Sequence, residues 1–216
     1  MNNKIFSSDQ YSRMYVAHMR TIIDEYFVNN NYYNRAIYLQ QLVDNLVSTD
    51  PNLFYSYTAF QNNLNSTVGN NIGVTELMNA RISFLQSLPE FTAQPPVINN
   101  VSSNLTSAVP YSTIYITANI TNSDYAYLGY RFKFSDKFEK LQMFDDGNHG
   151  DGVAGDGLFG VALTVDARDV QYYIYAENMD AGIFSPERAE KEFHQLPVVS
   201  GLVINEIMAS NISKIA

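Results

Sequence analysis

Five side chains that carry oxygen ligands gather in the stretch 144–160, FDDGNHGDGVAGDGLFG. They are Asp145, Asp146, Asn148, Asp151 and Asp156. Calcium in proteins is held by roughly 6–8 oxygen ligands, including backbone carbonyls and water. Glycine allows the tight turns that would bring such side chains together. The stretch therefore predicts a calcium site formed by these five residues.

The same letters fit a second interpretation. Asp and Asn side chains accept hydrogen bonds from nearby backbone amides, so the stretch is also typical of a hairpin loop that caps its own turns. His149 lies within it and is expected to face solvent, although an imidazole can also bind a metal. The sequence leaves the cation site and the self-capped loop open as alternatives.

Two more specific motifs do not fit. Counted from Asp146, an EF-hand needs Gly at position six and Glu at position twelve, where this chain has Asp151 and Gly157. The pattern GxGxxG occurs at 150–155, but a dinucleotide site needs a strand directly before it and a helix directly after it. Asp156 and Asp151 would also repel a pyrophosphate, so we predict neither motif.

Composition excludes several classes of function. The 216 residues contain no cysteine, which removes disulfides, thiol catalysis and cysteine-ligated zinc. A formal net charge of −9 argues against nucleic acid as a partner, because phosphates require a basic surface. No apolar run approaches the ~20 residues of a membrane span, and the first residues lack the apolar core of a signal peptide. The three histidines are far apart and lack zinc-site spacing, so no catalytic residue is predicted.

Residues 1–92 have the periodicity of helices. Ser7 to Gln10 has the form of a capping box, and apolar residues then recur every three or four positions. A second helix is expected from about Tyr32 to Leu46, a third after Asp50-Pro51, and a fourth that ends before Pro89. Adjacent prolines at 95 and 96 indicate an extended linker.

From residue 97 the apolar period changes to two. Short runs rich in β-branched and aromatic residues predict six strands, at 97–101, 113–120, 125–134, 138–144, 158–165 and 170–177. Such a series indicates an immunoglobulin-like antiparallel β-sandwich. The predicted fold class is therefore α+β, a helical bundle over 1–92 followed by a sandwich over 93–198. Residues 199–216 contain one further apolar run, at 202–208, which is too short to fold alone.

Three segments resemble parts of known families. The letters IFSSDQYSRMYVAHMRTIIDEYF and LVDNLVSTDPNLF resemble the C-terminal helical end of the spore-coat CotH family, which has an atypical kinase-like fold. The letters DDGNHGDGVAGDGLFG, VQYYIYAEN and SPERAE resemble an Ig-like domain of large secreted bacterial proteins. GLVINEIMASN resembles the first strand of a lamin-tail domain. The resemblance implies a slice of a longer protein whose nucleotide-binding residues would precede Met1.

These observations predict a non-catalytic structural or adhesive fragment of a secreted bacterial protein, with the parent at the cell surface or outside the cell. A first alternative is an accessory region of a CotH-type kinase. A second is a carbohydrate-binding module that uses strand tyrosines, namely Tyr125, Tyr127, Tyr130, Tyr172, Tyr173 and Tyr175. The expected partners are a protein or cell-surface ligand and a second copy bound through an exposed apolar helical face.

Overall fold

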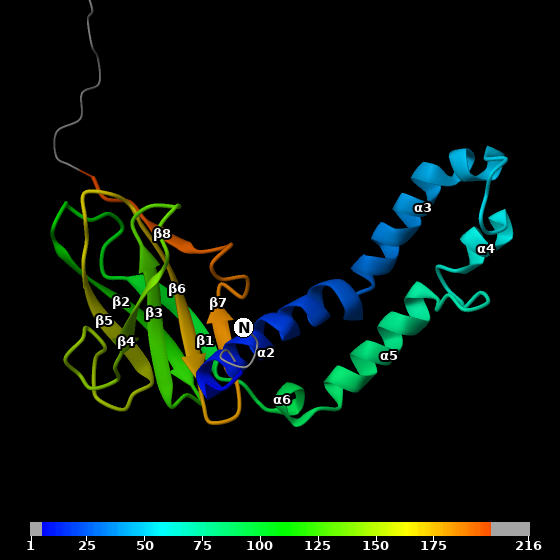
Figure 1. Ribbon diagram of the computed structural model, residues 1–216. Helices are drawn as coiled ribbons and strands as arrows, with labels where there is room; N and C mark the ends of the chain where they lie inside the picture. Colours follow the sequence, from blue (N-terminus) through cyan, green and yellow to red (C-terminus); the bar gives the residue numbers. More distant parts are fainter. Residues whose placement is uncertain (1–5, 200–216) are drawn as a thin grey trace, which may run out of the picture. The chain divides into compact units, whose positions relative to one another are not determined.

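The computed structural model describes residues 6–199, shown in Figure 1. The predicted lamin-tail strand at 202–208 lies outside the described residues. The described chain forms two compact units. The helical unit comprises residues up to 97 with 122–124 and 176–188, and the sandwich unit comprises 98–121, 125–175 and the described residues from 189 onwards. The predicted domain limits 1–92, 93–198 and 199–216 stay predictions.

The helical unit contains five α-helices and one π-helix among the described residues. They are α2 (Asp9–Ile22), η1 (Ile23–Val28), α3 (Asn31–Thr49), α4 (Tyr57–Asn62), α5 (Val74–Gln86) and α6 (Pro89–Thr92). Strand β7 (Gly182–Ser185) belongs to the same unit. Helices were predicted throughout this region, and the structure confirms a helical region before the strands.

Two predicted helix starts differ from the structure. Ser8 is the N-cap of α2 and makes no side-chain capping bond, while the Gln10 amide donates to Glu177 Oε1 at 3.1 Å instead of closing a capping box. After α3, Asp50 accepts a hydrogen bond from the Asn52 amide and forms a turn. The next helix, α4, begins only at Tyr57 and is capped by Ser56. A local Asx turn thus replaces the expected cap at Asp50-Pro51.

Helix α2 is held to the segment 176–188 by polar and aromatic contacts. Arg13 Nε donates to Glu177 Oε2 at 3.0 Å, and Glu177 is only 3% exposed. The His18 ring stacks on Phe184 with a centroid distance of 4.3 Å. Burial of the carboxylate makes the pair with Arg13 far more sensitive to loss of a partner than a surface pair would be.

Helix α3 differs from α2, because most of its apolar surface is exposed. It has no buried residue, and its large apolar side chains remain exposed, Leu42 to 65% and Leu46 to 70%. An apolar groove of about 890 Å³ lies beside it and is lined by residues such as Leu53, Phe54 and Ile72. Among the described residues of the helical unit, these apolar side chains of α3 therefore remain largely uncovered.

The sandwich consists of two antiparallel-paired sheets. The strands are β1 (Val97–Ser103), β2 (Thr113–Thr121), β3 (Tyr125–Arg131), β4 (Glu139–Met143), β5 (Leu158–Thr164), β6 (Val170–Glu177) and β8 (His194–Leu196). One sheet has the order β1-β2-β5, and the other has β4-β3-β6-β7 with β8 also on β6. All six predicted strands are present, so the predicted α+β class with an Ig-like sandwich is confirmed.

The sandwich core follows the strand period in β2 and departs from it in β6. In β2, Ile114, Ile116 and Ala118 are fully buried on one face. In β6, Tyr173 and Tyr175 are buried, and so is Ile174 between them. The alternation expected in this strand is thus absent, because both of its faces are inaccessible to solvent.

Candidate functional site

The acidic loop, residues 144–160, connects β4 to β5 and is organised around Asp151. The Asp151 side chain has no exposed surface. Its Oδ2 accepts hydrogen bonds from the amides of Asp146 at 2.6 Å and Gly147 at 2.8 Å, and its Oδ1 accepts from the His149 amide at 2.6 Å. The loop winds round this carboxylate, so a buried charge is balanced by backbone donors.

These bonds set the protonation of the group. Burial alone acts to raise the pKa of Asp151, but the amide hydrogen bonds outweigh it and hold the pKa below its ordinary value. The carboxylate is therefore ionised at neutral pH. Because Oδ2 already accepts two bonds, its lone pairs are occupied.

Asp145 and Asp156 each serve another part of the loop. Asp145 accepts from the amides of Gly155 at 2.8 Å and Gly157 at 2.9 Å. Asp156 accepts from the amides of Val153 at 3.1 Å and Leu158 at 2.9 Å. Both carboxylates thus cap turns of the loop, as the second sequence interpretation expected.

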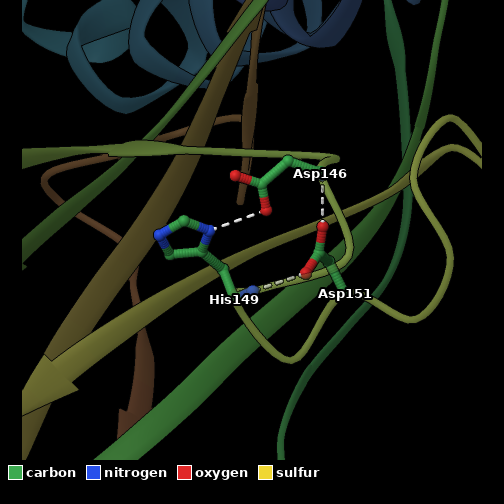
Figure 2. Close-up of side chains that lie close together, drawn as sticks. All are labelled: Asp146, His149 and Asp151. Atoms are coloured by element: carbon green, nitrogen blue, oxygen red, sulfur yellow. Dashed lines mark hydrogen bonds and ion pairs between the residues drawn. The ribbon is translucent and has the colours of Figure 1, made fainter.

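Asp146 is the most accessible carboxylate of the central cluster, with 43% of its side chain exposed. Figure 2 shows the His149 ring facing it, and His149 Nδ1 lies 2.9 Å from Asp146 Oδ1. The hydrogen bond with His149 is the main cause that lowers the pKa of Asp146. The His149 ring also stacks on Phe144, at a centroid distance of 4.8 Å, so it is not simply directed into solvent as expected.

The structure brings together three of the groups that could hold a metal. One ligand atom each from Asp146, His149 and Asp151 lies within 4.8 Å of the others. Asn148 lies beside them, but its side-chain amide donates to the Asp146 carbonyl at 3.2 Å. Two carboxylates and an imidazole do not by themselves form the all-oxygen shell of calcium. The arrangement fits a self-capped loop well, and a calcium site only with several water or carbonyl ligands; the predicted five-residue calcium site stays a prediction.

At two positions of the loop only glycine fits, because neighbouring atoms lie too close for a Cβ atom. A side chain at Gly160 would place its Cβ 2.4 Å from the His149 carbonyl oxygen. Gly150 has a φ of 76° and would bring a Cβ within 2.9 Å of the Tyr115 ring. The loop therefore packs on the β2-β5 sheet, and glycine at these two positions follows from that packing.

The other candidate residues lie apart from the loop. His194 is in β8, with its ring centroid 5.3 Å from that of Tyr172. Of the strand tyrosines considered for carbohydrate binding, Tyr172, Tyr173 and Tyr175 are buried and cannot form an exposed platform. These three belong to the core. Of the six strand tyrosines, Tyr125 is the most accessible, with 49% of its surface exposed.

One feature of the sandwich unit carried no recognisable sequence signal. Arg131 at the end of β3 is only 9% exposed, and its guanidinium carbon lies 4.2 Å from the Phe138 ring centroid. The letters RFKFSDKFEK at 131–140 show alternating basic and aromatic residues, but spacing alone does not tell which of the basic residues turns inward.

Comparison with known proteins supports the Ig-like domain. A family model described as "Conditioned medium factor 2nd Ig-like domain" matches residues 135–173, which include β4, the acidic loop and β5. A search of curated proteins finds no match. A solved structure titled "Crystal structure of Br derivative BhCBM56" is 9% identical, covers 49% of this chain and 95% of its own, and has a TM-score of 0.29. That similarity is too low to support a functional argument.

Within the described residues, none of the helices has both the length and the apolar character needed to cross a bilayer.

Proposed function

We propose that this chain is a non-catalytic structural or adhesive part of a secreted bacterial multidomain protein, located at the cell surface or outside the cell. The resemblances of the sequence to a CotH-like helical end and to a lamin-tail strand support this proposal. The Ig-like domain is the part that the family match supports.

One observation carries this proposal. The acidic loop, which brings Asp146, His149 and Asp151 together, uses carboxylates to cap its own backbone. A carboxylate whose lone pairs are occupied by amide donors is a poor general base and a poor nucleophile, and for Asp151 these bonds also lower the pKa. Such a loop stabilises a connection between strands.

Calcium binding at this loop is part of the proposal. It is supported by the exposed Asp146 carboxylate and by the proximity of the Asp146 and Asp151 oxygens. Because Asp151 has little free acceptor capacity, we propose a weak site with a Kd of roughly 10⁻⁴–10⁻³ M, the range typical of extracellular modules. The ion would stiffen the loop and take no part in a reaction.

The alternative from another class is an accessory region of a CotH-type kinase, as the resemblance of residues 5–92 implies. Isothermal titration of the whole chain with Mg-ATP, followed by a radiolabelled phosphate-transfer assay, distinguishes the non-catalytic proposal from the kinase alternative. We expect no binding and no transfer. Saturable ATP binding or transfer of phosphate would overturn the non-catalytic proposal.

We also propose that a second copy of this chain binds the exposed apolar face of α3. Residues 28–75 carry only Arg35, Asp44 and Asp50 as charged side chains, whereas the whole chain carries a net charge of −9. Two copies therefore repel each other least where α3 presents Leu42 and Leu46.

Light scattering of the chain during gel filtration tests the dimer. We expect twice the chain mass of 24.4 kDa, and a monomer for the Leu42→Asp/Leu46→Asp variant. Asn34→Asp, which adds one charge at an exposed polar position of the same helix, should remain dimeric. A native chain that stays monomeric at high concentration would refute this proposal.

A further inference from the structure

Arg131 is a buried cation that has no carboxylate partner among the described residues. Its Nε donates to Gln171 Oε1 at 2.8 Å, and its Nη1 donates to the Asp136 carbonyl at a long 3.4 Å. Its Nη2 is buried and has no hydrogen-bond partner. Among residues 6–199, the ion pairs of the structure do not include Arg131. Buried charges in proteins are normally paired, so the missing acceptor requires an explanation.

Three phenylalanines surround the guanidinium. The distances from Arg131 Cζ to the ring centroids are 4.2 Å for Phe138, 4.7 Å for Phe134 and 5.2 Å for Phe193. These cation–π contacts compensate part of the lost hydration. They satisfy no N–H group, and Nη2 therefore still lacks an acceptor.

The ring of Phe134 is the most exposed member of this cage. It is 73% exposed, in the connection between β3 and β4, whereas Phe138 packs edge-on against the buried Tyr173. Displacement of Phe134 would lose little buried area. It would open the guanidinium from outside and leave an exposed aromatic ring beside it.

The segment that carries Phe134 and Phe138 has the opposite charge to the chain as a whole. The segment 131–140 contains Arg131, Lys133, Lys137 and Lys140 against two acidic residues, in a chain whose net charge is −9. The three lysines are exposed. A polyanion would therefore be attracted to this stretch and repelled from most other surfaces.

We propose that Arg131 and Phe134 form a binding site for a carboxylated polysaccharide, with Nη2 donating to the carboxylate of one uronic acid residue. A uronic acid combines a carboxylate with a flat C–H face that can pack on an aromatic ring, and a polymer of it presents further carboxylates to Lys133 and Lys137. A single acidic peptide side chain has no such ring face.

This inference supplies a ligand class for the adhesive role, and so rests on the proposed function. Its test has a separate readout from ATP binding. It is also run in a chelating buffer, which makes it independent of calcium. Failure of the polysaccharide test would leave a structural module, whereas ATP binding would overturn the non-catalytic proposal itself.

The experiment measures binding of the whole chain to polygalacturonate by affinity electrophoresis at low salt. The methyl ester of the same polymer serves as the uncharged control ligand. We expect esterification and Arg131→Lys each to weaken binding by at least about tenfold, because each removes a charge-assisted, directional hydrogen bond. Arg168→Lys is the matched control, since Arg168 belongs to the same unit and is paired with Asp166; it should leave affinity within about twofold.

Three results would overturn the proposal. They are equal binding of the esterified polymer, equal affinity of Arg131→Lys, and single-stranded DNA binding as tightly as polygalacturonate, which would indicate a general polyanion surface. If Arg131→Lys does not fold, the native chain is titrated with a galacturonate trimer while the Nε–H signal of Arg131 is followed by NMR. The signal should move with the acid and not with its methyl ester, and a signal that stays in place would refute the site.

Discussion

Replacement of Asp151 by asparagine tests how the acidic loop is held. Asparagine keeps the size of the side chain but replaces one acceptor oxygen by an NH₂ donor. In the native loop both oxygens face backbone N–H groups, three of them within 2.8 Å. The variant therefore loses at least one charge-assisted bond and leaves a buried amide opposite another donor. Each effect costs about 1–3 kcal/mol, so we expect the free energy of unfolding to fall by about 2–6 kcal/mol.

Urea unfolding followed by circular dichroism measures this loss. Asp156→Asn is the matched control, because Asp156 also accepts two amide bonds in the same loop but is exposed, and water can replace what it loses. Its effect should be less than half as large. Equal losses in the two variants, or a loss below about 1 kcal/mol for Asp151→Asn, would refute the idea that one buried carboxylate organises the loop.

Three more predictions concern pH, packing and a buried ion pair. Because the folded-state pKa of Asp151 lies below its ordinary value of 3.8, the stabilisation is present above that pH and is lost on acidification. The stability difference between the native chain and Asp151→Asn should therefore shrink below about pH 4. Gly129→Ala would place a Cβ 2.2 Å from the Tyr173 ring and should cost about 1–3 kcal/mol in urea unfolding. Arg13→Met leaves Glu177 buried without its cation and should cost about 2–4 kcal/mol.

Each of these has a result that contradicts it. A stability difference that stays constant from pH 7 to pH 3 would show that Asp151 has the same pKa in both states. Unchanged stability of Gly129→Ala would mean that the Tyr173 ring is not in this position. Arg188→Met breaks the more exposed pair with Glu25 and should cost less than about 1 kcal/mol; equal losses would argue against burial as the cause.

The strands could be read from the sequence because their evidence is local. Alternation in Ile114 to Ala118 places one face of β2 in the core, and the structure shows that face buried. The turn at Asp50 could not be predicted in the same way, since the Asp-Pro pair suits both a helix start and a turn. Which one forms depends on the packing of residues beyond it.

The sequence shows that the oxygen-bearing residues share one loop, but it does not show how that loop is arranged. The five oxygen-bearing residues do share one loop, yet Asp145, Asp151 and Asp156 serve different amides, which depends on the turns and not on residue type. The sequence also does not predict that the Arg131 side chain is buried. Its neighbours Gln171 and Phe193 lie about 40 and 60 residues away in the chain, and only the fold brings them together.

Thermal unfolding of the metal-stripped chain with and without 10 mM calcium tests the proposed structural role of the loop most directly. At the proposed affinity the ion should stabilise the folded state by about 1–3 kcal/mol, because it binds that state alone. Asp146→Asn keeps the turn and removes the exposed charge, and the stabilisation should disappear in it. An unfolding temperature that does not move with calcium in the native chain, or that moves equally in Asp146→Asn, would contradict a calcium-stabilised loop.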